Sequence, residues 1–223
     1  MNPRLSLSAR LEGLSAAFGI ETVRQEPPPA SETLEPSRPV PVILAGASGR
    51  SLDCYTWGIF PQWGKDSVHA DSGTIAEHPG YRDLFRKQRC VVPCDGFYGY
   101  RQEGKRTAAY RFHLKDSGVF GLAAFYDVWQ SPSGREERAF SILKTDASRL
   151  VSGYQDWMPA ILSPKAMELW LNPAVTDPDL LQAALGPSRR EDMTVTAVPA
   201  ERKSSWRERA KLRQLPEYGS VKP

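Results

Sequence analysis

Cysteine and histidine are scarce in this sequence. Of its 223 residues, three are cysteine and three are histidine. Three thiols cannot all pair, and a disulfide-stapled domain needs a far higher cysteine density. We therefore expect Cys54, Cys90 and Cys94 to be reduced thiols.

Long apolar runs are also absent. The chain has no stretch of about 18 apolar residues, the length typical of a membrane helix. The opening MNPRLSLSARLEG lacks the uninterrupted apolar core of a signal peptide. We therefore expect no membrane partner and a cytoplasmic location.

Several common catalytic patterns are missing too. There is no G-x-S-x-G elbow and no glycine-rich phosphate loop. A zinc site at Cys90, Cys94 and a histidine is conceivable, but C-x-x-x-C is a weak spacing. In a strand both cysteines would face the same side, which favours buried thiols. We expect no metal and no cofactor.

Positive charge is concentrated at the end of the chain. From Arg202 to Pro223 the net charge is +5, so the rest of the chain sums to −2 within a total of +3. Attraction to phosphate must therefore come from local patches or from this segment. We predict one domain over residues 1–200 and a basic tail over 201–223.

Alternating apolar residues between glycine, proline and charged turns predict a strand-rich chain. Expected strands cover 40–46, 52–60, 89–93, 96–101, 108–114, 118–129 and 139–145. Expected helices cover the opening segment to about residue 20, then 81–88, 163–171 and 177–185, with Ser163 as a cap before Pro164. Many strands without regular βαβ alternation predict an α+β fold built on antiparallel sheets.

Residues 55–66 are rich in aromatic side chains. Trp57 has the pattern of a core residue, whereas Trp63 follows Pro61 and precedes Lys65 in a turn. An exposed tryptophan beside a lysine could stack on an unpaired base. A tryptophan that covers the edge of the core fits the same pattern, so both interpretations stay open.

Three long stretches carry a family resemblance: WGIFPQWGKD at 57–66, GTIAEHPGYRDLFRKQRCVVPCDGFYGY at 73–100 and LVSGYQDWMPAILSPKAMELWL at 150–171. Together they resemble the SOS-response-associated peptidase (SRAP) family, in order, from the N-terminus to about Leu171. The resemblance implies barrel-like antiparallel sheets with surrounding helices.

The resemblance also implies a chemistry. Family members expose a cysteine at position 2, whose amine and thiol crosslink to the aldehyde of an abasic site in single-stranded DNA. An asparagine, a glutamate and a histidine orient the sugar and move protons. This chain carries Asn2, His69, Gly99 and Gln155 at those four positions. The sequence therefore predicts a site whose scaffold is kept and whose catalytic groups are lost.

The family's DNA-binding positions are kept in part. Basic or aromatic residues stand at Arg4, Trp63, Lys65, Arg82, Arg86 and Arg89. Two family arginines are replaced, by Asp71 and by Trp157. An aspartate in place of a cation repels phosphate, so we expect a weakened single-strand groove.

These observations favour a catalytically degenerate SRAP-family protein that binds single-stranded or damaged DNA without a covalent bond, as a binding or accessory factor. Two alternatives stay open. One is an enzyme with a relocated site that uses Cys94 or His69. The other is a protein-interaction module that uses Trp157 and nearby aromatic residues.

Overall fold

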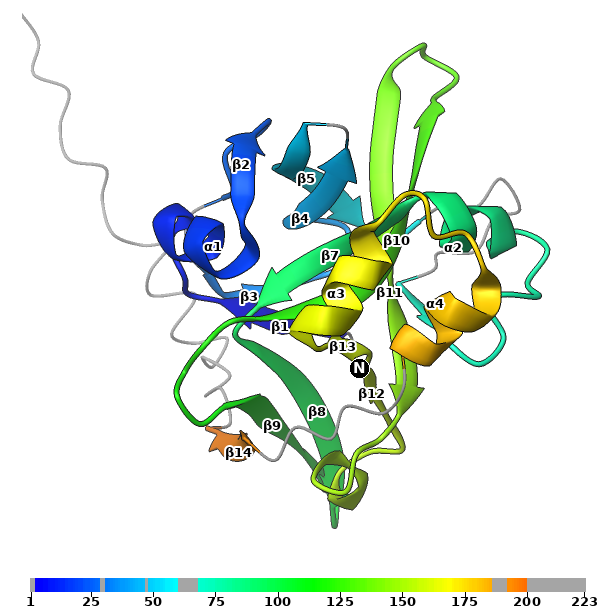
Figure 1. Cartoon of the computed structure of the whole chain (residues 1–223). Helices are drawn as coiled ribbons and strands as arrows, with labels where there is room; N and C mark the ends of the chain where they lie inside the picture. The colour runs from blue at the N-terminus through cyan, green and yellow to red at the C-terminus, as the bar shows by residue number, and fades with distance from the viewer. Residues whose placement is uncertain (1–2, 29–30, 47, 60–67, 186–191, 200–223) are drawn as a thin grey trace, which may run out of the picture.

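The computed structural model of the chain describes residues 3–28, 31–46, 48–59, 68–185 and 192–199. Strands dominate it, and a few short helices lie around two sheets (Figure 1). The expected α+β class with antiparallel sheets is confirmed. None of the helices in the described ranges is long and apolar enough to cross a membrane.

Five strands form a closed barrel. They are β4 (Pro39–Gly46), β5 (Gly49–Trp57), β7 (Arg89–Cys94), β10 (Phe120–Gln130) and β11 (Glu136–Asp146). Consecutive neighbours in the order β5, β4, β7, β10, β11 pair antiparallel. A short parallel pairing of β11 with β5, at Ala139 with Thr56 and Phe140 with Trp57, closes the ring.

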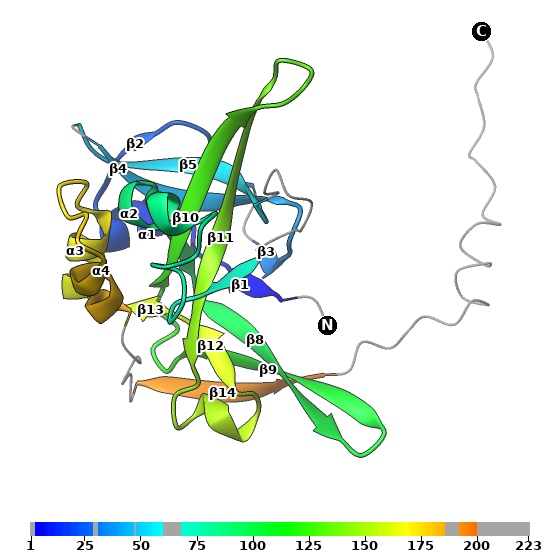
Figure 2. The ribbon, with the colours of Figure 1, turned by 90° about the vertical axis from the view of Figure 1, so that its right-hand side faces the viewer.

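A second sheet of five strands lies next to the barrel, and its hairpin of residues 96–114 is at the bottom of Figures 1 and 2. Its order is β14 (Met193–Val198), β9 (Arg106–Leu114), β8 (Gly96–Glu103), β1 (Leu5–Leu7) and β3 (Ser31–Leu34). Asp95 alone separates β7 of the barrel from β8 of this sheet. The chain therefore passes from one sheet to the other without a loop.

Four short strands extend the barrel sheet. They are β2 (Ile20–Val23), β6 (His69–Asp71), β12 (Trp157–Pro159) and β13 (Ile161–Leu162). Strand β11 binds two of them on opposite edges, because Lys144 pairs with Asp71 of β6 and with Pro159 of β12. A turn of 3-10 helix, η1 (Val151–Gly153), precedes β12.

The helices begin where the sequence places helix-start residues. Ser163 caps α3 (Pro164–Leu171) by accepting a hydrogen bond from the backbone N–H of Ala166, which confirms the expected cap. Asp177 caps α4 (Pro178–Ala184) in the same way. The remaining helices are α1 (Leu11–Phe18) and α2 (Arg82–Lys87).

The core confirms the expected burial of the barrel residues. Trp57 and the thiols Cys90 and Cys94 are all 0% exposed. Burial raises the pKa of both thiols well above their usual range, so they stay protonated. Within the described residues, no group of three or more His, Cys, Asp or Glu side chains could hold a metal ion.

The first residues differ from the expected helix. Leu5–Leu7 form β1, which pairs antiparallel with both β3 and β8, and the helix starts only at Leu11. Because β1 lies between two strands, all three of its side chains are buried. The conformation of this segment is determined by pairing with strands far away in the sequence, and local periodicity does not show such pairing.

Arg89 is a structural residue, not a surface cation. It is 7% exposed, and its guanidinium donates hydrogen bonds to five main-chain carbonyls. The acceptors are the carbonyls of Phe85, Arg86, Trp170, Asn172 and Val175. Arg89 therefore ties β7 to α2 and to the end of α3, and we correct its expected role as a DNA contact.

Replacing Arg89 should destabilise the protein. Arg89→Met leaves several buried carbonyls without a donor, and we expect a loss of about 3 kcal/mol in the free energy of unfolding. Urea denaturation measures it. Arg82→Met on the exposed side of α2 is the matched control, with an expected change below about 0.5 kcal/mol. Equal midpoints for the two variants would contradict the structural role of Arg89.

Candidate functional site

Gly99 lies in the middle of β8, opposite Tyr110 of β9. Its surroundings leave no room for a side chain. A Cβ atom at position 99 would lie 2.7 Å from Cε2 of Phe112 and 2.9 Å from Oε1 of Gln155. Contacts this short force a neighbour to move, so the place of a side chain at position 99 is already filled.

Gln155 fills that place and is fixed there. Its Oε1 accepts a hydrogen bond from the backbone N–H of Tyr100 at 3.3 Å. Its Nε2 donates to the carbonyl of Trp157 at 2.7 Å. The amide thus bridges β8 and β12, and its donor and acceptor both have partners.

Trp157 connects Gln155 to His69. The rings of His69 and Trp157 have centroids 4.9 Å apart, although β6 and β12 lie on opposite edges of β11. Trp57 also packs against His69, edge-on, with ring centroids 5.9 Å apart. The structure therefore brings Gly99, Gln155 and His69 into one contiguous cluster.

His69 is neutral near pH 7. Burial, followed by the nearby positive charge of Lys144, lowers the pKa of the imidazole to about 4. A histidine in this state cannot donate a proton as an imidazolium at neutral pH. The imidazole ring packs against two tryptophan rings.

Asp71 lies two residues beyond His69 on the same strand. It is exposed, and its Oδ2 lies 3.5 Å from Nζ of Lys144. The ion pair neutralises a cation beside the cluster. Among the described residues, this pair offers a phosphate no net positive charge.

Several expected site residues lie outside the described residues, namely Asn2, Trp63 and Lys65. Arg4 is described, and it lies beside β8, on the face of the sheet opposite Gly99. Its Nε donates to the hydroxyl of Tyr100 at 2.9 Å, and its guanidinium lies over the ring of Tyr98, with Cζ 5.3 Å from the ring centroid. Arg4 is half-buried against aromatic rings.

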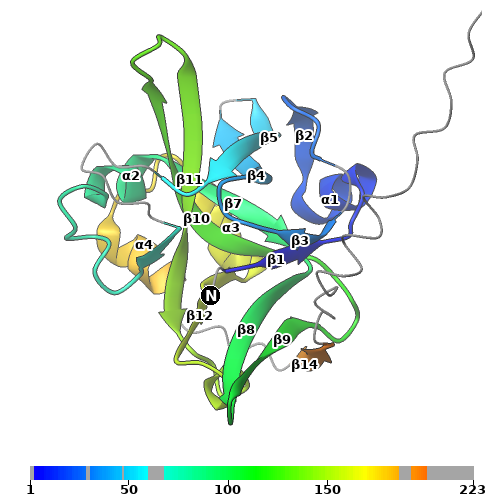
Figure 3. The ribbon, with the colours of Figure 1, turned by 180° about the vertical axis from the view of Figure 1, so that it is seen from behind.

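Arg82 and Arg86 lie on α2, and Arg82 is exposed. Figures 1, 2 and 3 all place α2 beside the barrel, away from β8. The expected basic residues that the structure describes therefore do not form one patch. A DNA strand that contacts both Arg4 and α2 must therefore span the surface that separates these two places.

Cys94 does not have the properties of a nucleophile. It is 0% exposed, and burial, with the charge of Asp95, raises the pKa of its thiol. A reactive cysteine needs solvent access and a lowered pKa. Cys94 therefore fits a core filler at the end of β7.

An aromatic cluster beside Gly99 was missed by the sequence analysis. Tyr110 and Tyr154 pack with ring centroids 4.5 Å apart, and Arg101 lies over both rings, at 5.2 and 5.1 Å. Tyr154 also meets Phe112 edge-on at 5.3 Å. The alternation of AAYRFHL places Tyr110 and Phe112 on one face, but no local signal points to Tyr154 as their partner.

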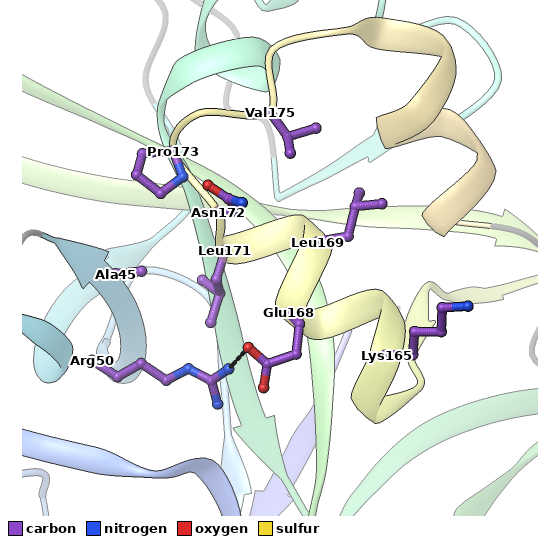
Figure 4. Close-up of a pocket in the computed structure, with 9 residues that line it drawn as sticks. All are labelled: Ala45, Arg50, Lys165, Glu168, Leu169, Leu171, Asn172, Pro173 and Val175. Atoms are coloured by element: carbon purple, nitrogen blue, oxygen red, sulfur yellow. Dashed lines mark ion pairs between the residues drawn. The ribbon is translucent and has the colours of Figure 1, made fainter.

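A cavity of about 560 Å³ lies elsewhere, between α3 and the β4–β5 hairpin (Figure 4). Arg50 and Glu168 form an ion pair of 2.6 Å in it. The other lining residues are Ala45, Lys165, Leu169, Leu171, Asn172, Pro173 and Val175. None of them belongs to the Gly99 cluster, so this cavity is separate from the candidate site.

Comparison with known families gives a match over residues 1–204 to the family described as SOS response associated peptidase (SRAP). Abasic site processing protein YoqW of Bacillus subtilis is 33% identical over 175 residues, which cover 75% of this chain and 78% of that protein. Abasic site processing protein HMCES of Gallus gallus is 30% identical over 158 residues, covering 57% of this chain and 47% of that protein.

Solved structures share the fold. A protein from Bacteroides thetaiotaomicron superposes with a TM-score of 0.77 at 26% identity, over 88% of this chain and 92% of that one. A protein from Bordetella bronchiseptica gives a TM-score of 0.76 at 20% identity, over 89% of this chain and 99% of the other. The SRAP-like fold expected from the sequence is confirmed.

Steric coupling between positions 99 and 155 can be measured. Gly99→Ala should destabilise the protein by about 2 kcal/mol because the methyl group meets Phe112 and Gln155. In a Gln155→Ala background the same change should cost about 1 kcal/mol less. Gly153→Ala is the control, because a Cβ there has no atom within 4 Å. Strict additivity in the double-mutant cycle would show that Gln155 does not fill this place.

Burial of neutral His69 should make stability depend on pH. Its pKa in the folded state, about 4, is below the unfolded value of 6.5. Below pH 6.5 the unfolded chain therefore binds the proton more readily. Folding stability should fall as the pH drops from about 6.5 to about 4, by about 3 kcal/mol. His69→Gln should flatten this slope in urea melts, whereas exposed His78→Gln should not. A wild-type slope that persists in His69→Gln would contradict the assignment.

Proposed function

This chain belongs to the SOS response associated peptidase family, and we propose that it is a catalytically degenerate member. It binds single-stranded or abasic DNA without a covalent bond, as a DNA-damage-associated binding or accessory factor in the cytoplasm. Curated relatives named abasic site processing proteins support the connection with damaged DNA.

The amide of Gln155 carries the proposal. Its Oε1 lies 2.9 Å from the place where a Cβ at position 99 would stand. The family resemblance puts a carboxylate at position 99 and an imidazole at 155. Here the neutral side chain of Gln155 stands at the position of the imidazole and occupies the space that the carboxylate would fill. Neither proton-transfer group is present.

The other candidate groups do not replace them. His69 has a pKa of about 4 and is packed against two tryptophans, so it is not a general acid at neutral pH. The thiols of Cys90 and Cys94 are fully buried. These placements weigh against the alternative of an enzyme with a relocated site.

Binding in this proposal rests on separate cations and aromatic rings. Arg4 lies against Tyr98 and Tyr100, and Arg82 and Arg86 lie on α2. Trp63, Lys65 and the basic segment 201–223 are further candidates on the sequence alone. Contacts of this kind are electrostatic and insensitive to base identity. The protein-interaction alternative has less support, because Trp157 is half-buried against His69.

Incubation with an abasic single-stranded oligonucleotide tests the loss of chemistry. We expect no adduct that survives heat and detergent on a denaturing gel, because the groups that would form it are missing. A hydroxylamine probe added to the same oligonucleotide confirms that its aldehyde is reactive. A stable protein–DNA band would refute the degenerate assignment.

Fluorescence anisotropy with a labelled single strand tests the binding. We expect affinity that falls steeply with salt, and a salt slope reduced by about 2 in the Arg82→Gln, Arg86→Gln double variant. Arg135→Gln, at the remote β10–β11 turn, is the control for loss of a cation elsewhere on the surface, and it should leave the salt slope unchanged. If the wild-type chain binds no strand even at low salt, the DNA part of the proposal fails.

A further inference from the structure

A buried carboxylate lies between the two sheets. Asp95 is 5% exposed, and its Oδ1 accepts hydrogen bonds from Ser6 Oγ at 2.6 Å and Arg111 Nη2 at 2.8 Å. Its Oδ2 accepts from the backbone N–H of Ser8 at 2.5 Å. Burial opposes ionisation, but these hydrogen bonds outweigh it and lower the pKa of the Asp95 carboxyl. Asp95 is therefore an anion whose two oxygens are engaged inside the protein.

Arg111 is held rigidly by this carboxylate. Its Nε donates to Ser6 Oγ at 3.0 Å, and its Nη2 donates to the carboxylate and to the carbonyl of Asp95. A guanidinium has five N–H donors, and these contacts use only Nε and Nη2. Within the described residues, Nη1 makes no hydrogen bond, and the side chain is 29% exposed.

The guanidinium lines a cavity of about 290 Å³ on the outer face of the second sheet. The other lining residues come from β1 and the residues after it, from β8 and from β14: Ser6, Ser8, Tyr98, Thr196, Ala197, Val198 and Pro199. None of them is acidic. The volume is near the lower end for small-molecule pockets, about 300 Å³, and suits a small polar group.

A second guanidinium lies near the cavity. Arg4 directly precedes β1, and its guanidinium covers the ring of Tyr98, which lines the cavity. A preorganised guanidinium that presents an unused N–H edge to a cavity without acids is suited to an oxyanion.

We infer that this cavity is a binding site for an oxyanion group, a phosphate or a carboxylate, held by the guanidinium of Arg111. The site is distinct from the Gly99 cluster, because Arg111 and Tyr98 point to the opposite face of the sheet from Gly99. It does not depend on the proposed DNA binding. A free small anion and the terminal phosphate of a nucleic-acid strand present the same chemistry.

Titration of the full chain with inorganic phosphate, followed by phosphorus NMR and calorimetry, tests the site. We expect saturable binding at one site, weakened at least 10-fold in Arg111→Gln. That variant leaves Asp95 without its cation and can unfold, so a second variant is needed. Thr196→Glu puts a carboxylate on the neighbouring strand, opposite Arg111, and leaves the Asp95 contacts intact.

Thr196→Glu should abolish phosphate binding, and the neutral Thr196→Gln should retain it. Circular dichroism melts confirm that both variants are folded.

Oligonucleotides with a 5′-phosphate, a 3′-phosphate or hydroxyl ends then identify the source of the anion. If the chain binds one phosphorylated oligonucleotide several-fold more tightly than the others, and Thr196→Glu loses this preference, the ligand is the end of a strand. If the chain binds inorganic phosphate but shows no such preference, the ligand is a free anion. Absence of saturable phosphate binding in the wild-type chain, or full binding in Thr196→Glu, would overturn the site.

Discussion

Closure of the barrel through β11 and β5 is the constraint on which the rest of the structure depends. The parallel pairing is short, but Phe140 stacks on Trp57, and the carbonyl of Phe140 accepts a hydrogen bond from the backbone N–H of Gly58 at 2.8 Å. Closure fixes β11, and the two edges of β11 hold β6 and β12. The contact of His69 with Trp157 across that strand is thus a consequence of how the barrel closes.

Buried charges link the layers around this barrel. Arg89 joins β7 to two helices through carbonyls, and Asp95, six residues later, joins β7 to β1 and β9. A buried charge is tolerated only when its hydrogen-bonding capacity is met, so each of these residues dictates the positions of several main-chain segments. Glycine at position 96 lets Arg111 approach Asp95, because a Cβ at position 96 would lie 2.7 Å from Nε of Arg111.

Sequence patterns predicted the long strands and the capped helices, because alternation and capping are local properties. They could not separate Arg89 from the exposed Arg82: Arg82 lies in the expected helix and Arg89 directly follows it, and only the packing of α3 encloses Arg89. The short strands β1, β6 and β12 were not predicted, since three residues are too few to show a period. Gly99 and Gln155 were identified singly by resemblance, whereas their contact joins positions 56 residues apart.

That contact changes how the departures from the family pattern are understood. A side chain at position 99 and the present orientation of Gln155 exclude each other, since both need the space in front of Phe112. With glycine at 99, a long amide at 155 can reach the backbone N–H of Tyr100 and the carbonyl of Trp157, and it stabilises the join between the two sheets. The resemblance implies a carboxylate at position 99 and an imidazole at 155, and the proposed loss of both corresponds to a single structural change. The amide of Gln155 then fills the space of the carboxylate with an internal hydrogen-bond bridge, and neither position carries a proton-transfer group.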